Sequence, residues 1–353
     1  WPILSSVLHL TRLSLAASAV SNIWIVLLWS RAVEGRGPTA GWPLWQALGL
    51  TAVIAVGLYV FGTALNDVLD VRRDRLFAPD RPLPAKLISP THAVVIALVS
   101  LLVALLCATR LGMLSVMLAL ACAGLVVLYN AAGKYLPAVG LLTLGLIRLT
   151  LMLIADPGLR FCWPLWLDMT HVVFIAALAW RLQRKRPHLT TYELWLLSAG
   201  WVIVSLAVIF WMGQRGVLVR LDMPWLWVGP ISMGVLALGL GVVVFRVSRT
   251  ERQAGRLVMN LGTAWLIVYD GSWLVSAGLW RESLWFVGLL GLLAASLLVC
   301  TFRRGRHARD AHGRARGRAI GSILTHLSLL LILAGGVVRV LTGQRGHIAF
   351  REG

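Results

Sequence analysis

Four of the chain's 14 acidic residues fall in one short stretch, between positions 67 and 80. Three of them, Asp67, Asp70 and Asp74, have a spacing that places side chains on one face of a helix, within roughly 60° of one another. Carboxylates held this close repel one another and favour protonation unless a cation lies among them. Their hard oxygen atoms suit Mg²⁺, which keeps several waters and bridges to substrate phosphates. The stretch predicts a Mg²⁺ site with these aspartates as catalytic residues and metal ligands.

Basic residues surround this acidic stretch. Arg72, Arg73, Arg75 and Arg81 follow the first aspartates closely and could meet phosphate charge that the metal leaves. The alternative is a solvated juxtamembrane segment of mixed charge. The concentration of acids on one helical face favours the site.

The elements that must position these residues are membrane helices. The chain has 353 residues, of which 59% are hydrophobic, and its mean hydropathy is +0.81. Apolar runs of about 20 residues recur along nearly its whole length, each long enough to cross a bilayer, and they lack the alternation that a β-barrel requires. The sequence predicts an all-α polytopic membrane protein with a bundle of about nine to eleven transmembrane helices. The expected spans are 14–31, 44–66, 91–109, 112–130, 137–155, 163–181, 192–213, 225–246, 257–279, 284–302 and 320–341.

The 33 basic residues indicate the orientation of the bundle. Counted on alternating sides of the expected spans, 22 Lys and Arg lie on the side of the acidic stretch and 10 on the other, with Arg148 inside a helix. Basic loops favour the cytoplasm, so we expect an integral membrane protein with its active-site loops on the cytoplasmic side, in the inner membrane if the source is bacterial. The net charge of +19 is spread between hydrophobic runs, which fits membrane topology better than nucleic-acid binding.

Arg148 is a charge inside a membrane span. It lies about 11 residues into its helix, hence about 16 Å deep, where a charge costs a few kcal/mol unless it meets a partner or a wet cavity. One interpretation is a cavity-lining cation near the substrate. The other is an internal ion pair with Asp270, which lies at comparable depth, and the two are compatible. Asn22 is a further polar residue in an apolar run. It could have a role at the site, or it could simply hydrogen-bond to a neighbouring helix as part of the packing.

The stretch from Asn66 to Asp74 resembles the NDxxDxxxD motif of the UbiA superfamily of intramembrane prenyltransferases. Asp80 to Pro84, followed by Ile88 and Ser89, is similar to that family's "RPLP…IS" continuation. Tyr129 to Lys134 resembles its "YN…K" stretch, and Gly145 to Arg148 is similar to a "GLxR" element of related proteins. The resemblance covers about residues 8–300.

The resemblance implies transfer of a prenyl group from an isoprenyl diphosphate to a lipophilic acceptor, expected to be aromatic, within the membrane. It implies that Mg²⁺ bound by the three aspartates draws off the diphosphate, and that the allylic cation is attacked in a cavity without water. Asn66, Arg81, Lys134 and Arg148 are then the expected substrate-binding residues.

The resemblance breaks at residues 181–193, where the family carries a second Asp-rich motif. This segment contains no aspartate, and Glu193 is its only acid. Asp156 and Asp168 are expected near the opposite membrane face and cannot substitute. One explanation is that Arg184 and Lys185 supply the missing positive charge as further substrate-binding residues. The alternative is a non-catalytic scaffold or lipid-binding subunit with partners in a membrane complex. A transporter is disfavoured, because paired helices broken by Gly or Pro are not evident.

The expected organisation has three parts. Residues 1–302 form the UbiA-like prenyltransferase membrane domain, 303–319 a basic cytoplasmic loop, and 320–353 an extra transmembrane helix with a tail. The basic loop suits anionic membrane lipids and has no aromatic residues interleaved for nucleic acid. Most of the 17 tryptophans fall near expected helix ends, as interfacial anchors do.

Overall fold

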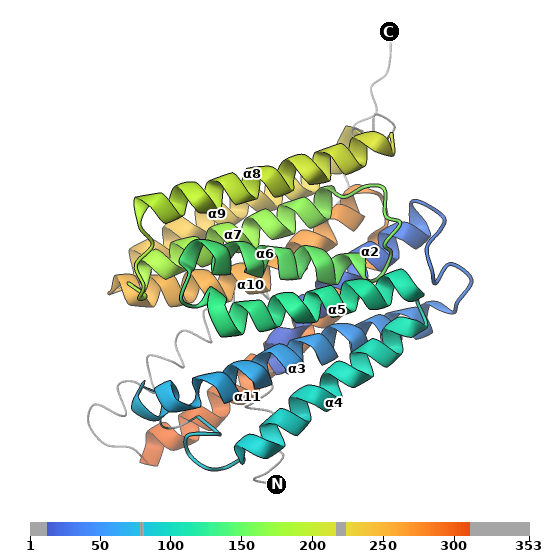
Figure 1. The fold of residues 1–353 in the computed structure, drawn as a ribbon. Helices are drawn as coiled ribbons and strands as arrows, with labels where there is room; N and C mark the ends of the chain where they lie inside the picture. The colour runs from blue at the N-terminus through green and yellow to red at the C-terminus, as the bar shows by residue number, and fades with distance from the viewer. Residues whose placement is uncertain (1–12, 78, 80, 217–223, 311–353) are drawn as a thin grey trace. The chain divides into compact units, whose positions relative to one another are not determined.

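The computed structural model describes residues 13–77, 79, 81–216 and 224–310, and in this part of the chain all regular structure is helical (Figure 1). The elements are α2 (Leu13–Ala32), α3 (Leu44–Phe77), α4 (Pro90–Thr109), α5 (Met113–Leu128), the π-helical turn η1 (Tyr129–Gly133), α6 (Pro137–Leu153), α7 (Trp163–Leu182), α8 (Thr191–Gln214), the 3-10 turn η2 (Pro224–Trp227), α9 (Val228–Val247), α10 (Glu251–Ser276) and α11 (Trp280–Asp310). The expected all-α fold is confirmed.

The chain divides into two compact units, residues 1–286 and 287–353. The first contains α2 to α10 and the beginning of α11. Of the second, the structure describes residues 287–310, which continue α11 as a helix. The first residues of the basic segment, 303–310, are therefore helical, while 311–319 and the expected span 320–341 lie outside the described residues.

The hydropathy pattern locates the helices well. Each expected span up to residue 302 coincides with a helix, and six helices in the described part of the chain are long and apolar enough to cross a membrane, with α6 as a shorter apolar helix. The largest difference concerns α3, which we expected to end at residue 66 and which continues to Phe77. The apolar run and the acidic stretch are therefore one continuous helix, so the helical spacing of the aspartates is real.

Helix α2 packs in the interior of the first unit, against α3, α6 and α10, and α7 packs between α6 and α10. By contrast, only 11% of the most apolar segment of α8, and of α9, is buried within the protein. Large side chains on α8, such as Trp195 and Phe210, are 74% and 67% exposed. Because an apolar face this open is stable in lipid, we expect α8 and α9 to face lipid.

Some tryptophans have a different role from the one expected. Trp29 and Trp273 are 1% and 0% exposed. The Trp29 ring stacks on Phe161 with centroids 4.8 Å apart, and Phe161 contacts Trp273 edge-on at 5.7 Å. These three rings connect α2 and α10 through the loop that precedes α7. They are therefore core residues and not interfacial anchors.

Candidate functional site

The acidic end of α3 carries its aspartates towards the protein interior. Asp67 and Asp74 are 3% and 6% exposed, and Asp70 is half-buried. Arg81, from the segment after α3, places Nη1 2.5 Å from Asp74 Oδ2 and 3.8 Å from Asp67 Oδ1. Asn66 Nδ2 lies 3.3 Å from Asp67 Oδ1. The structure therefore brings four of the expected site residues together with the expected cation Arg81.

Lys134 reaches the same cluster from η1. Its Nζ lies 2.8 Å from Asp70 Oδ2, and both side chains are mostly buried. A backbone contact between two glycines permits this position, because a Cβ on Gly140 would lie 2.1 Å from the carbonyl oxygen of Gly133. With no side chains between them, the end of the π turn packs directly on the start of α6 and holds Lys134 beside α3.

The donor set fits a hard divalent cation in chemistry. It offers only carboxylate and amide oxygens, which suit Mg²⁺. In the described residues, however, no three His, Cys, Asp or Glu side chains converge as a ready metal cluster. Instead, Arg81 and Lys134 divide the carboxylates between them, since like charges on one face need opposite charge nearby.

A cavity of about 300 Å³ opens beside this cluster. Asn66, Tyr129 and Asn130 line it near the acidic end of α3, and Arg148 lines it from α6. The remaining walls are mainly aliphatic, as in small-molecule sites. Asn130 donates from Nδ2 to the Val126 carbonyl oxygen at 3.0 Å, while its buried Oδ1 has no partner within the described structure.

Arg148 is held by α2 and not by Asp270. Its Nη1 donates to Asn22 Oδ1 at 2.9 Å and its Nη2 to Ser18 Oγ at 3.2 Å. Asn22 Nδ2 in turn donates to Asp168 Oδ2 at 2.5 Å and to Asp270 Oδ2 at 3.1 Å. No direct Arg148–Asp270 ion pair is present among the described residues, so that pairing was wrong in detail: Asn22 bridges the two groups.

Asp168 also belongs to this interior network. We expected it near the membrane face opposite the acidic motif; it lies on the second turn of α7, is 0% exposed and meets Asn22. The available signal was an isolated acid inside an apolar helix, which in a membrane indicates a buried partner.

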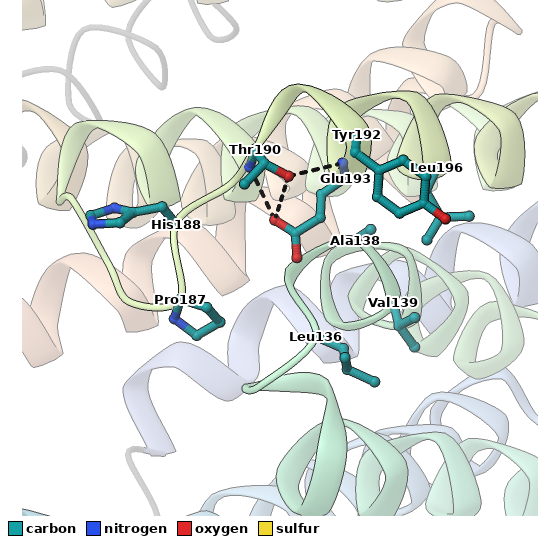
Figure 2. A pocket seen from close by; sticks show the side chains of 9 residues that line it. All are labelled: Leu136, Ala138, Val139, Pro187, His188, Thr190, Tyr192, Glu193 and Leu196. Atoms are coloured by element: carbon teal, nitrogen blue, oxygen red, sulfur yellow. Dashed lines mark hydrogen bonds between the residues drawn. The ribbon is translucent and has the colours of Figure 1, made fainter.

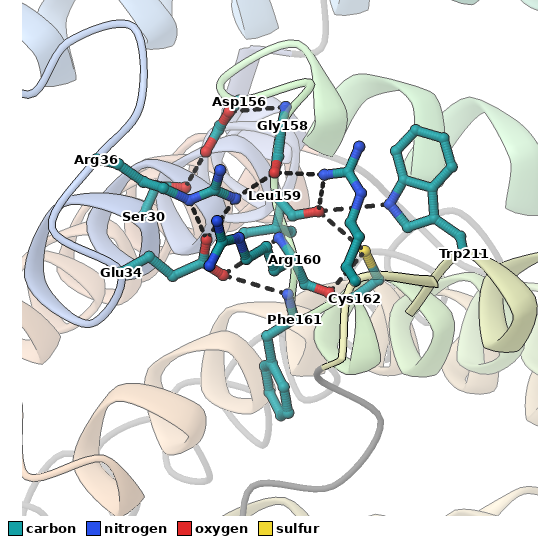
Figure 3. Close-up of polar contacts among 11 residues, drawn as sticks. Ser30, Glu34, Arg36, Asp156, Gly158, Leu159, Arg160, Phe161, Cys162 and Trp211 are labelled. Atoms are coloured by element: carbon teal, nitrogen blue, oxygen red, sulfur yellow. Dashed lines mark hydrogen bonds and ion pairs between the residues drawn. The ribbon is translucent and has the colours of Figure 1, made fainter. Parts of the chain in front are cut away.

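Asp156 does lie in a separate structural network. It accepts from Ser30 Oγ and from the Gly158 backbone N–H, each at 2.8 Å. The Arg36 guanidinium donates to the Gly158 carbonyl oxygen nearby (Figure 3), and Arg215 Nη1 donates to the same oxygen at 2.5 Å. These contacts fasten the loop before α7 to α2 and to the end of α8, so Asp156 is occupied in holding that loop.

Glu193 does not face the acidic motif. It forms a capping box at the start of α8, accepting from the Thr190 backbone N–H at 3.0 Å, while Thr190 Oγ1 accepts from the Glu193 N–H (Figure 2). The pair lines an open groove of about 520 Å³ between the starts of α6 and α8. In residues 181–193, all of which the structure describes, the one acidic side chain is therefore turned away from the aspartates of α3.

The two expected basic residues of this segment separate. Arg184 forms an exposed ion pair with Glu251, Nη2 to Oε2 2.9 Å. Lys185 lies over the Trp180 ring, with Nζ 5.2 Å from its centroid. Partial burial lowers the pKa of Lys185, and the positive charge of Arg73 on α3 lowers it further. Lys185 is thus within electrostatic range of the acidic end of α3, whereas Arg184 is engaged elsewhere.

Comparison with known proteins identifies a family and a fold. The sequence model of the UbiA prenyltransferase family matches residues 23–267. No curated protein matches the chain significantly. A solved structure of digeranylgeranylglyceryl phosphate synthase is 15% identical, covers 78% of this chain and 99% of its own, and has a TM-score of 0.55. A UbiA homologue from Archaeoglobus fulgidus, bound to GPP and Mg²⁺, is 14% identical over 82% of this chain and 99% of its own, with a TM-score of 0.42. The first likeness supports the helical fold.

Proposed function

Because the chain belongs to the UbiA prenyltransferase family, we propose that it transfers a prenyl group from an isoprenyl diphosphate to a lipophilic, ring-bearing acceptor within the membrane. One observation carries this proposal: Asn66 belongs both to the cluster of acids and cations on α3 and to the wall of the cavity of about 300 Å³. A charged head group and an apolar chain can therefore be held side by side.

The proposed metal ligands are Asp67, Asp70 and Asp74. The metal, when bound, supplies positive charge against the diphosphate as it departs. When the aspartates turn to the metal, their ion pairs with Arg81 and Lys134 are broken. The two cations can then donate to phosphate oxygens, and charge-assisted hydrogen bonds of this kind are strong. Both cations are already in place, so little reorganisation is needed as negative charge develops on the leaving group.

The cavity provides the site for bond formation. Its aliphatic walls exclude water, which would otherwise capture the allylic cation. Tyr59 and Tyr129 also line it, and an aromatic ring face near a cation is stabilising. In this proposal a ring carbon of the acceptor attacks the allylic carbon as its C–O bond to the diphosphate breaks. The ring carbon then gives up its proton to the released diphosphate, which stays with Arg81 and Lys134.

Lys185 is the proposed replacement for positive charge at the missing second acidic motif. Lys185 lies within electrostatic range of Arg73, which is on α3 beside the acidic motif, and this supports a diphosphate-binding role for the lysine. Arg184 is a weaker candidate, because it is paired with Glu251. Arg148, deep in its helix, is proposed to contact the acceptor end of the cavity and not the diphosphate.

A non-catalytic scaffold is the second candidate, favoured by the capping role of Glu193. The decisive experiment incubates the purified protein in lipid nanodiscs with radiolabelled geranyl diphosphate, Mg²⁺ and a membrane lipid extract. The enzyme forms a labelled lipid that is absent when EDTA is added. Diphosphate binding without any labelled product from extracts of several sources would contradict the proposed transfer and favour the scaffold.

A further inference from the structure

A buried polar cluster built from four helices meets the cavity at Arg148, the end of the cavity distant in sequence from Asn66 on α3. Its members are Ser18, Ser21 and Asn22 of α2, Arg148 of α6, Asp168 of α7 and Asp270 of α10. Asn22, Asp168 and Asp270 are each 0% exposed. Of this cluster, Arg148 lines the cavity directly.

The cluster contains one guanidinium group and two carboxyl groups. Both carboxyl groups accept from the same Asn22 Nδ2, at 2.5 Å for Asp168 Oδ2 and 3.1 Å for Asp270 Oδ2, so a single amide group brings them side by side. Two ionised carboxylates in contact inside a bundle repel strongly, whereas two that share one proton attract. The buried Oδ1 atoms of Asp168 and Asp270 have no hydrogen-bond donor within the described structure. A proton between the two groups supplies a donor where none is otherwise available.

One shared proton leaves a single negative charge on the pair, which balances the positive charge of Arg148. This end of the cavity is then electrically neutral although it is built from charged groups. A guanidinium has five N–H donors, and the hydrogen bonds to Asn22 and Ser18 use two of them in the described structure. The end of the cavity therefore offers N–H donors without a surplus of positive charge.

We infer that this neutral polar cluster is the acceptor-binding end of the cavity and that it selects an acceptor with an uncharged oxygen, a carbonyl or a hydroxyl, over one with a carboxylate. The inference rests on the proposed prenyl transfer. An anionic group would bring an unbalanced charge into a site of low dielectric, which is costly. An uncharged oxygen accepts from Arg148 without that cost.

The test compares two probes of nearly equal size, 4-hydroxybenzamide and 4-hydroxybenzoate, that differ by one charge. Binding is measured by calorimetry on the protein in nanodiscs, without diphosphate or Mg²⁺. We expect the amide to bind about tenfold more tightly or better, a difference of about 1.4 kcal/mol. Arg148→Gln should remove the binding of the amide.

Charge variants of the pair sharpen the test. Asp168→Asn imitates a protonated aspartate, so the cluster stays neutral and the preference for the amide should persist. Asp168→Asn combined with Asp270→Asn leaves Arg148 unbalanced, and the preference should reverse towards the benzoate. Glu251→Gln, an equal change of charge on the exposed surface, should leave the ratio of the two affinities unchanged.

The contrary results are equally clear. Benzoate binding as tight as amide binding in the unaltered protein would overturn the inference, and so would failure of the amide to bind. If the double variant does not fold, the comparison of probes on the unaltered protein and on Arg148→Gln still decides. Geranyl diphosphate binding with Mg²⁺, measured on the same samples, is independent of this cluster. Its persistence would show that only the acceptor inference had failed.

Discussion

At the scale of single residues, the acidic end of α3 is stabilised by basic partners that are distant in sequence. Lys134 is 64 positions from Asp70, and Arg81 approaches from the segment after the helix. The sequence could indicate the three aspartates, because their spacing is a local property of one helix. It could not indicate which cation meets which carboxylate, because that depends on how η1 and the segment after α3 fold back.

Lys134 provides the first prediction. Lys134→Gln removes a buried cation that is proposed to hold the diphosphate, so geranyl diphosphate should bind about ten- to a hundredfold more weakly, as for loss of a charged hydrogen bond of about 1.5–3 kcal/mol. Titration calorimetry with Mg²⁺ measures this. Lys86→Gln is the matched control, since Lys86 is exposed on a loop. Equal effects of the two changes would indicate general surface attraction only.

Asn22 provides the second prediction. Asn22→Ala removes the amide that bridges Arg148 to Asp168 and Asp270. Buried polar groups are then left without partners, so stability should fall by about 1–3 kcal/mol or more, seen as a lower midpoint of unfolding in detergent. Asn260→Ala on the exposed side of α10 is the control. If both variants unfold alike, Asn22 is not the bridge described here.

At the scale of elements, the position of Lys134 depends on a close approach of backbone to backbone. The sequence predicted the helices on either side of η1, because their apolar runs are long. The π turn and the contact of Gly133 with Gly140 were not predictable, since neither leaves a periodic signal. The same reason explains Asp168: its helix was expected, but its contact with Asn22 joins α7 to a helix that is distant in sequence.

Gly140→Ala tests this contact. The added Cβ would lie 2.1 Å from the Gly133 carbonyl oxygen, so the π turn must shift. We expect a loss of stability of about 1–3 kcal/mol and weaker diphosphate binding, because Lys134 moves with the turn. Gly124→Ala is the control: a Cβ there meets nothing within 4 Å, and helix propensity should raise stability slightly. Unchanged stability and binding in Gly140→Ala would show that the turn can yield.

At the scale of the whole molecule, hydropathy and charge account for most of the architecture. Apolar runs fixed the helices because a membrane segment must satisfy its backbone internally. The interior cluster around Arg148 was predictable only in part. The sequence indicates that this charge is buried in a helix, but it does not indicate which helices surround it.

The side of the membrane is a prediction from the distribution of basic residues. The account places the acidic end of α3 and residues 181–190 in the cytoplasm. In a background without the four cysteines, a cysteine at His188 should be protected from an impermeant thiol reagent in intact cells, and one at Gly41 should react. Both positions are exposed. Labelling at His188 with protection at Gly41 would reverse the orientation.

The central claim is that the acidic face of α3 binds a prenyl diphosphate through Mg²⁺. Asp67→Asn combined with Asp70→Asn keeps side-chain size and removes two units of charge, and relief of repulsion should leave the helix folded. The most direct measurement is geranyl diphosphate affinity with Mg²⁺ and with EDTA, for the unaltered protein and the double variant. The account predicts that Mg²⁺ strengthens binding to the unaltered protein and has no such effect on the variant. Metal-dependent binding that survives both substitutions would contradict it.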